Sequence, residues 1–275
     1  MKILFIGDIF AKQGRKAINA FLPALIKKYK IDFVIANAEN CTHGRSLNIR
    51  HYLFLKSIGV NFFTFGNHTW DNEQIYDILN NKDTIRPLNI KKSFSQQATT
   101  GEGSRVVKVK NKRVRITNLL GVSAACKGMQ SNPFLLLDKE LPKWKNTHDI
   151  HIIDFHANAT SEKNAMLIAY NNKVSAILGT HTHVQTADDK IYKNTAYITD
   201  VGMTGPSCGI IGANPTTILQ MFREQVLHFK LDPDKSPYQL NAVLLTFDNK
   251  TNKPKSIKRI NLVQENTKGF SSTAE

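Results

Sequence analysis

The stretch at residues 66–71 sets an amide, Asn67, beside an imidazole, His68, within the sequence Gly-Asn-His-Thr-Trp-Asp. An apolar run at 61–65 precedes it and predicts a buried strand, and residues 72–80 after it predict a helix. Asn67 and His68 would therefore lie at the carboxyl end of a strand, which is where open α/β sheets place their chemistry. Side chains of these two types need partners, and the chain supplies them at other strand ends.

Polar side chains follow four further apolar runs, each of which predicts a strand. They are Asp8 after residues 2–7, Glu39 and Asn40 after 32–36, His156 after 149–155, and His181 and His183 after 173–178. Because the carboxyl ends of parallel strands meet at one edge of a sheet, we expect these side chains to gather there. In the spacing His181-x-His183, both imidazoles point to the same side of an extended segment, so they can reach a shared ligand.

Carboxylates, imidazoles and amide oxygens together suit borderline divalent metals such as Mn, Fe or Zn. The set exceeds the needs of one ion, whereas two metals about 3.5–4 Å apart with a bridging carboxylate would use it. Taken alone, Asp8 would more often cap a helix, Glu39 and Asn40 would be polar loop residues, and His156 would be a hydrogen-bonded core histidine. The coincidence of five such strand ends favours the metal site.

Other reactive residue types lack such partners. His51, His148, His151 and His228 are expected to be structural, and the role of His43 stays open. The three cysteines are Cys41, Cys126 and Cys208, without the spacing of a zinc cluster. An odd number of cysteines without a secretory signal predicts reduced thiols in a cytoplasmic protein. Cys41, beside the predicted site, is expected to be a small packing residue rather than a nucleophile.

The elements that must position these residues begin with alternating strands and helices. Helices are expected over 13–29, with Pro23 inside, and over 48–58, and Asp71 could cap the helix at 72–80. This order implies parallel strands joined by right-handed crossovers.

The rest of the chain is more varied. It predicts a hairpin of strands 105–110 and 113–118, helices at 134–144, 160–170 (capped by Thr160 or Ser161) and 216–225, a strand at 192–199, and a final antiparallel pair at 239–247 and 255–263. Residues 119–133 give no clear prediction. Because there is no repeat or clear linker, one domain is expected over 1–266, with a flexible tail at 267–275.

The chain has 37 basic and 22 acidic residues, a formal net charge of +15. This excess indicates either attraction to polyanions such as RNA or the lysine-rich usage of an A+T-rich genome, and the scattered lysines favour the second. A basic surface would still raise the rate of encounter with an anionic substrate. No apolar run is long enough to span a bilayer, so a membrane is not an expected partner.

The order of the motifs resembles the calcineurin-like metallophosphoesterase superfamily and, more closely, the bacterial YmdB-like phosphodiesterases. The likeness rests on residues 66–71, 154–157, 159–163, 179–188 and 198–206, and it extends over nearly the whole chain. It implies an α/β fold, a layered sandwich of two mixed central sheets flanked by helices. Phe10 stands where the wider superfamily has a histidine ligand, and Glu39 stands where it has a bridging aspartate; both are usual in the YmdB-like branch. Asn158 falls where that branch often has Glu, which leaves its role open.

The resemblance also implies the roles of the site residues. One metal would be held by Asp8, Glu39 and His183 and the other by Glu39, Asn67, His156 and His181, with Glu39 bridging. Asn40 would bind near the first metal or the phosphate, and His68 would protonate the leaving oxygen. Asn40, His68 and His183 would contact the substrate. The cofactors would be two divalent ions per chain, Fe or Mn before Zn or Mg.

By the same resemblance, the chain would be a metal-dependent phosphodiesterase that hydrolyses small phosphodiesters by metal-activated hydroxide. The substrates would be cyclic nucleotides, 2′,3′-cyclic and also 3′,5′-cyclic, with RNA as a further candidate partner. A homo-oligomer is expected if apolar residues of the 105–118 hairpin are exposed. Two alternatives stay open: a phosphomonoesterase or nuclease on the same scaffold, and a regulatory RNA- or protein-binding module with a weakly active metal site.

Overall fold

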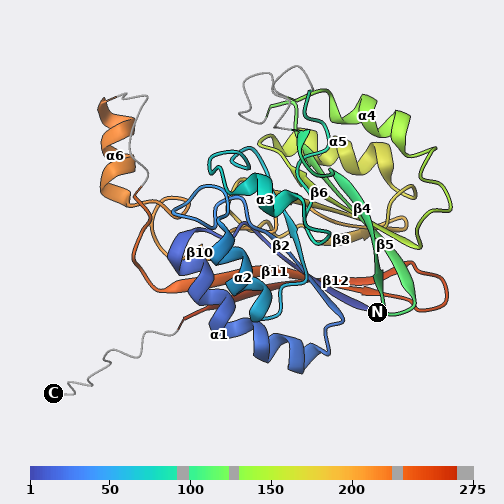
Figure 1. Ribbon diagram of the computed structural model, residues 1–275, viewed down its shortest axis with the longest axis horizontal. Coiled ribbons are helices and arrows are strands. Elements are labelled where there is room, and N and C mark those ends of the chain that lie inside the picture. The colour runs from blue at the N-terminus through green and yellow to red at the C-terminus, as the bar shows by residue number, and fades with distance from the viewer. Residues whose placement is uncertain (92–98, 124–129, 225–231, 265–275) are drawn as a thin grey trace.

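Two six-stranded sheets, stacked face to face, form the centre of the computed structural model, which describes residues 1–91, 99–123, 130–224 and 232–264 (Figure 1). The first sheet contains β1 (Lys2–Ile6), β2 (Phe33–Asn37), β3 (Phe62–Thr64), β10 (Gly205–Pro206), β11 (Tyr238–Phe247) and β12 (Pro254–Val263). Its order is β10-β11-β1-β2-β3, with β12 paired to β11. The strands β1, β2 and β3 are parallel, and β11 is antiparallel to β1.

The second sheet is also mixed. It contains β4 (Ser104–Val109), β5 (Lys112–Leu120), β6 (Ile150–His156), β7 (Ala176–Thr180), β8 (Lys190–Tyr192) and β9 (Thr195–Ile198), in the order β4-β5-β6-β7-β9-β8. The four inner strands are parallel, and the edge strands β4 and β8 are antiparallel to their neighbours.

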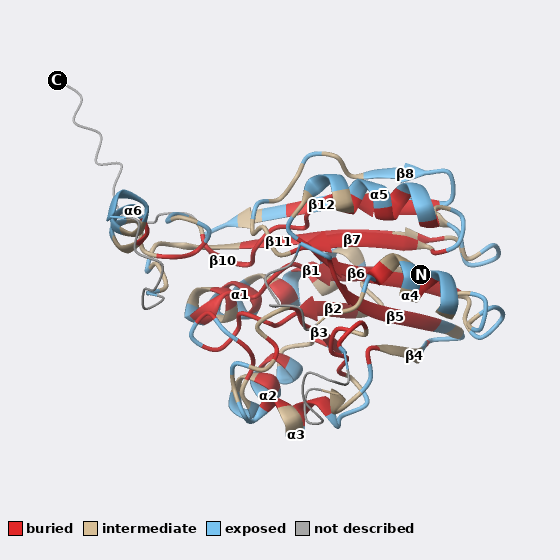
Figure 2. Cartoon of the chain, turned by 90° about the horizontal axis from the view of Figure 1, so that it is seen from above, coloured by how far each residue is buried: buried red, intermediate tan, exposed pale blue. Residues whose placement is uncertain are grey.

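Helices cover the outer faces of the two sheets (Figure 2). The first sheet packs against α1 (Ala11–Tyr29), α2 (Ile49–Ser57) and α3 (Ile75–Leu79), and the second against α4 (Pro133–Glu140) and α5 (Thr160–Tyr170). A further helix, α6 (Pro215–Glu224), projects from this body in both views. The expected α/β sandwich of two mixed sheets flanked by helices is confirmed.

The alternation of side chains along each buried strand produces three apolar layers. In β1, Ile3 and Phe5 point into the core between the sheets, whereas Leu4 and Ile6 point toward α1. In β6, Ile152 faces the same inter-sheet core. Both faces of these strands are buried, which is why they read as continuous apolar runs in the sequence.

Two predicted strands differ from the structure. The strand expected at 192–199 contains β9 but starts too early, at the last residue of β8, and the antiparallel pairing of β8 with β9 through a two-residue turn was not predicted. The strand predicted at 173–178 begins later, at Ala176, and continues through Thr180. Ser175 in the turn before it donates its backbone N–H to the carbonyl of His151, which aligns the start of β7 with β6.

The predicted helix caps were also wrong. The helix expected at 72–80 is shorter, α3, and its N-cap residue is Gln74; Asp71 pairs with His68 instead. Helix α5 has Ala159 at its N-cap, and Thr160 is already its first helical residue. The hairpin of β4 and β5 and the pair of β11 and β12 are confirmed.

None of the helices among the described residues is long and apolar enough to cross a membrane. Residues 267–275 lie outside the described part, so the flexible tail stays a prediction, as do the single domain and the cytoplasmic location. The hairpin of β4 and β5 has no large exposed apolar side chain, so it gives no support to self-association. The homo-oligomer therefore stays a prediction as well.

Candidate metal centre

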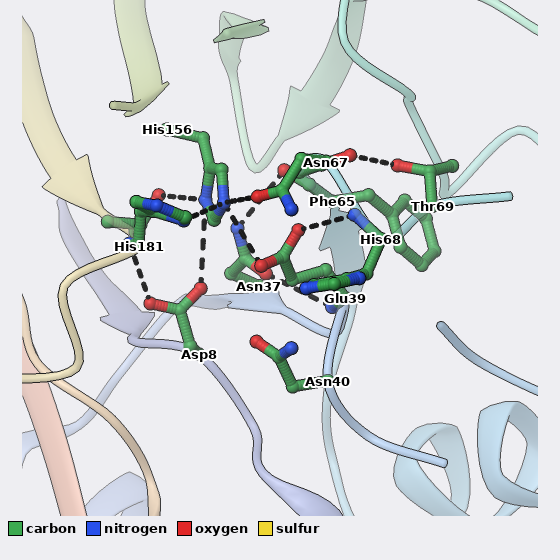
Figure 3. Close-up of polar contacts among 12 residues, drawn as sticks. Asp8, Asn37, Glu39, Asn40, Phe65, Asn67, His68, Thr69, His156 and His181 are labelled. Atoms are coloured by element: carbon green, nitrogen blue, oxygen red, sulfur yellow. Dashed lines mark hydrogen bonds and ion pairs between the residues drawn. The ribbon is translucent and has the colours of Figure 1, made fainter. Parts of the chain in front are cut away.

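The ends of five strands from two sheets meet at the candidate site (Figure 3). The backbone N–H of His181, after β7, donates to Asp8 Oδ2 after β1 at 3.0 Å. Behind this contact, Asn37 Nδ2 in β2 donates to Asp154 Oδ2 in β6 at 3.0 Å. The expectation of a single parallel sheet was wrong, because the parallel strands belong to two facing sheets whose carboxyl ends share one side.

His156 is at the centre of the cluster. Its Nε2 lies 3.0 Å from Glu39 Oε1, 3.0 Å from Asn67 Oδ1 and 3.0 Å from His181 Nδ1. The donor atoms of Glu39, His156 and His181 lie within 4.8 Å of one another, close enough to hold one metal ion. Glu39 and His156 are buried, as expected for residues at the end of core strands.

The orientation of His156 is fixed from behind. Its Nδ1 lies 2.9 Å from Thr180 Oγ1, and this hydroxyl donates to Asp154 Oδ1 at 2.7 Å. Because the hydroxyl gives its proton to a carboxylate, it accepts one from Nδ1. The other nitrogen, Nε2, therefore faces the oxygens of Glu39 and Asn67. A hydrogen bond of this kind is the usual way of orienting a metal-binding histidine.

The charges around His156 favour a cation. Burial opposes a positive charge on this imidazole, but Glu39 and Asp8 outweigh it and raise the pKa of His156 to about 9. Burial also opposes the Glu39 carboxylate, yet His156 lowers its pKa to about 2. Burial raises the pKa of Asp8 well above its usual range. A divalent cation would balance both buried carboxylates in place of the proton on His156.

A second group of acceptor atoms involves His183 and Asn40. His183 Nδ1 donates to the carbonyl of Ile211 at 2.8 Å, and Asn40 Nδ2 donates to the carbonyl of Gly44 at 3.0 Å. The atoms left over are the lone pairs of His183 Nε2 and Asn40 Oδ1, which face each other at 3.3 Å. Two acceptors cannot bond to each other, but both can bind a cation. Nearby, Asp8 Oδ1 is buried without a hydrogen-bond partner among the described residues.

The two histidines after β7 are neutral and held in an unusual backbone conformation. Burial, followed by the nearby His156, lowers the pKa of His181 to about 3, and burial also lowers that of His183. Neutral imidazole is the form that binds metals. His181 and His183 have φ values of 100° and 67°, in a region that residues other than glycine rarely adopt. Such strain is common at functional sites and requires support from the surroundings.

A buried ion pair supplies this support. Lys163 Nζ in α5 donates to Asp200 Oδ2 at 2.7 Å and to the carbonyl of Thr180 at 2.8 Å. Asp200 Oδ2 also accepts the backbone N–H of Thr182, between the two histidines, at 3.0 Å. The sequence reasoning gave no role to Lys163, Asp200, Thr180 or Asp154, although the motifs at 154–157, 159–163 and 198–206 contain three of them. The roles of these four residues become visible only in the folded structure, where they contact the site residues or the loop that bears them.

Gly66 leaves room for the cluster. A Cβ atom at this position would lie 2.0 Å from Glu39 Oε2 and 2.4 Å from His156 Nε2. Real Cβ atoms do not approach other atoms so closely, so the site requires glycine here.

His68 stands beside the cluster rather than within it. Its side chain is one-third exposed, and its Nδ1 lies 2.9 Å from Asp71 Oδ2, which Arg45 also contacts at 3.6 Å. The backbone N–H of His68 donates to Glu39 Oε2 at 3.2 Å. Because a carboxylate only accepts, Asp71 holds the proton of His68 on Nδ1 and orients the ring, which leaves Nε2 for another partner.

Four other residues discussed from the sequence either pack beside the site or lie at the surface. The ring of Phe10 packs edge-on against His183 with centroids 5.5 Å apart, which positions that imidazole without providing a ligand. Cys41 is buried, and burial raises the pKa of its thiol to about 12, which fits packing rather than nucleophilic attack. Asn158 and His43 are exposed.

The histidines expected to be structural are engaged elsewhere. His51 Nδ1 contacts Thr42 Oγ1 at 2.9 Å, and His148 packs edge-on against the buried His151. His228 and Cys126 lie outside the described residues.

The family of this chain follows from a match over most of its length. A profile of the family described as YmdB-like protein matches residues 4–260. The chain belongs to the YmdB-like family. A Mycoplasma pneumoniae protein named phosphatase/phosphodiesterase is 45% identical, with 96% of this chain and 94% of the relative covered. A Bacillus subtilis protein named 2′,3′-cyclic-nucleotide 2′-phosphodiesterase is 39% identical, with 94% of this chain and 96% of the relative covered.

Solved structures agree with this membership. A crystal structure of a phosphatase from Mycoplasma pneumoniae is 43% identical with a TM-score of 0.92, over 96% of this chain and 93% of that one. A hypothetical protein from Thermus thermophilus is 33% identical with a TM-score of 0.87, over 96% of this chain and all of that one. More distant 5′-nucleotidase structures share the fold alone, for example one from Staphylococcus aureus at 17% identity and a TM-score of 0.62. This YmdB-like chain is thus a hydrolase with the calcineurin-like metallophosphoesterase fold.

Proposed function

We propose that this YmdB-like protein is a dinuclear-metal phosphodiesterase that hydrolyses cyclic nucleotides, with 2′,3′-cyclic nucleotides first and 3′,5′-cyclic nucleotides second. The observation that carries the proposal is the convergence of Glu39, Asn67 and His181 on Nε2 of His156, with Glu39 and His156 themselves buried. The substrate class comes from the name of the Bacillus subtilis relative, which is similar over nearly its whole length.

The donor set suits two divalent ions. In this proposal Glu39 would contribute to both ions. Asp8 and His183 would hold one, with Asn40 as a further ligand or a phosphate contact, and Asn67, His156 and His181 would hold the other. The donors are nitrogen and oxygen atoms without a thiolate, which suits Fe or Mn, with Zn or Mg as alternatives. When bound, two metals activate water and neutralise charge on a phosphoryl group.

Side chains of the protein would orient the substrate and protonate the leaving group. Asn40, whose amide nitrogen has a second hydrogen besides the one given to the carbonyl of Gly44, would orient the phosphoryl oxygens, and His183 would act on them only through the metal that it holds. His68 would act in its doubly protonated form: Nδ1–H is held by the Asp71 carboxylate, and Nε2–H would pass its proton to the leaving oxygen as the ester bond breaks, which leaves a neutral imidazole. Because the leaving group of a 2′,3′-cyclic nucleotide is the ribose 2′ oxygen in a 2′-phosphodiesterase, the expected product is a nucleoside 3′-monophosphate.

The test is a comparison of substrates with product analysis. Purified protein with Mn²⁺ is incubated with 2′,3′-cyclic adenosine monophosphate, its 3′,5′-cyclic isomer and a phosphomonoester, and products are separated by anion exchange. We expect the 2′,3′-cyclic substrate to react fastest and to give the 3′-monophosphate. Faster release of phosphate from the monoester would instead support the phosphatase named for the Mycoplasma pneumoniae relative.

A further inference from the structure

A basic cavity of about 490 Å³ lies between α1 and the start of α2. Four side chains with permanent charge line it, Lys12, Arg15, Lys16 and Arg50, together with the imidazoles of His43 and His51. Among the described residues that line this cavity, none has an acidic side chain. Within the part of the chain that the structure describes, none of the four cations forms an ion pair. Unpaired cations gathered around a hollow attract anions.

Two further side chains that line the cavity, His51 and Phe54, indicate what kind of anion it could bind. Burial, and after it the charges of Arg15 and Arg50, lower the pKa of His51 to about 4, so this imidazole is neutral beside the cations. The ring of Phe54 in the wall is 38% exposed. A groove that combines positive charge with an exposed aromatic ring is typical of surfaces that bind single-stranded nucleic acid.

The basic cavity adjoins the metal centre through one short loop. Asn40 faces His183 on one side of this loop, and three residues later His43 lines the cavity on the other. Helix α1 holds the loop in place, because Ala11 donates its backbone N–H to the carbonyl of Asn40 at 2.9 Å and Arg15 donates to the carbonyl of Cys41. A second cavity of about 370 Å³ shares Lys12, Lys16 and His43 and also contains Asp232 and Asp234.

We propose that the basic cavity binds the phosphates of a single-stranded oligoribonucleotide whose 3′-terminal 2′,3′-cyclic phosphate occupies the metal centre. The substrate class would then be RNA ends as well as free cyclic mononucleotides. The chemistry is consistent, since a 2′,3′-cyclic phosphate is the same ester whether its 5′ oxygen is free or joined to a chain. The inference rests on the proposed function for the reaction, but the cavity can be tested by binding alone.

The binding test uses a fluorescent six-nucleotide RNA with a 3′-phosphate, which resembles the product and is not a diester at its end. Its Kd is measured by anisotropy between roughly 50 and 200 mM salt with the Mn²⁺-loaded protein. In Lys16→Glu/Arg50→Glu, we expect the Kd to rise at least about tenfold. The magnitude of the slope of log binding constant against log salt concentration should fall by about 1.4, because two phosphate contacts are lost and each contributes about 0.7. The matched control is Lys139→Glu/Lys145→Glu, which reverses two exposed charges in and after α4, across the molecule (Figure 1).

The activity test compares a 2′,3′-cyclic mononucleotide with the same six-nucleotide RNA ending in a 2′,3′-cyclic phosphate. The ratio of kcat/KM on the RNA to that on the mononucleotide should fall at least about tenfold in the double variant and stay unchanged in the control. Unchanged RNA binding in Lys16→Glu/Arg50→Glu, equal weakening in the control, or tighter binding of duplex DNA would overturn the proposal. Failure of the wild-type protein to hydrolyse either substrate would contradict the proposed function, while the anisotropy would still decide whether the cavity binds RNA.

Discussion

Three donor atoms of the candidate metal centre are oriented by a hydrogen bond that the same side chain makes through its other polar atom. His156 uses Nδ1 toward Thr180, His183 uses Nδ1 toward the carbonyl of Ile211, and Asn40 uses Nδ2 toward the carbonyl of Gly44. His183 Nε2 and Asn40 Oδ1 are left as acceptors that face each other, and His156 Nε2 faces the oxygens of Glu39 and Asn67. The contact between His183 and Asn40 would be repulsive without a cation, which is the physical reason to assign a metal rather than a hydrogen-bonded core.

His68 is the residue with which to separate metal binding from catalysis. Because it lies outside the ligand cluster and carries the proposed leaving-group proton, His68→Ala should lower kcat by about 10²–10⁴-fold. The metal content should stay that of the wild type. The measurement pairs steady-state hydrolysis of a cyclic nucleotide with metal analysis of the same preparation.

Asp71→Asn serves as the matched variant, since it keeps a hydrogen-bond partner for His68 Nδ1 but removes the carboxylate. We expect a smaller loss of kcat than in His68→Ala. If His68→Ala lost its metals, the His68 side chain would have to be reassigned as a ligand, because alanine keeps the backbone N–H that Glu39 accepts.

The sequence predicted which residues meet here but not the contacts that support them. Glu39, Asn67 and His156 could be found because each follows an apolar run, and that position is visible in one dimension. Lys163 could not, because a lysine in a helix usually lies on the solvent side, and only the fold brings it to Asp200. Asp71 was predicted to be a helix cap because the sequence does not show that His68 competes for it.

At the scale of elements, the turn after β3 can approach β6 only because it begins with glycine. Gly66→Ala should reduce metal content and cyclic-nucleotide hydrolysis together, since its Cβ would collide with Glu39 and His156. Metal analysis and activity are measured on protein whose folding is checked by thermal unfolding.

The control is Gly101→Ala, whose Cβ would lie 2.5 Å from the carbonyl oxygen of Leu79, away from the metal centre. We expect this variant to lose stability but to keep metals in the fraction that is folded. Full metal content in Gly66→Ala would show that the loop can shift without harm, contrary to the close packing described above.

Helix α5 holds the strained loop of His181 and His183 through the buried Lys163–Asp200 pair. Lys163→Met should lower the free energy of unfolding by about 3–5 kcal/mol, because it leaves the Asp200 carboxylate buried without its partner. Denaturant unfolding measures the change. The control Lys143→Met breaks the exposed pair with Glu140 and should cost no more than about 1 kcal/mol.

Equal and small effects in the two variants would mean that Asp200 finds other partners, and the support of the loop would then have to come from backbone contacts. Rescue cannot be expected from Lys163→Arg, since the larger guanidinium has no room in a fully buried position.

The sequence predicted the buried strands better than the exposed ones. The runs at 2–7 and 149–155 were found within about one residue because both of their faces are apolar. The exposed strand β8 was missed, and the strand predicted for β9 ran across the turn, because that turn consists of Lys193 and Asn194 and lacks the Asn-Gly signal of a tight hairpin.

At the scale of the whole molecule, neither sheet holds the metal centre alone. Asp8, Glu39 and Asn67 follow strands of the first sheet, and His156 and His181 belong to the second. Metal binding would therefore join the two halves of the sandwich and contribute to their stability by mass action. The sequence pattern could not show that the strands divide between two sheets, because parallel strands of one sheet or of two give the same alternation with helices. Only the likeness to known phosphoesterases indicated two sheets.

Metal dependence of catalysis is tested by hydrolysis of an aryl phosphodiester by purified protein, with Mn²⁺ and with EDTA, together with the metal content. We expect about two metal ions per chain and hydrolysis that requires metal and disappears with chelator. Two bound ions without hydrolysis in Mn²⁺, Fe²⁺ or Zn²⁺ would contradict this expectation and favour a regulatory module whose metals are structural.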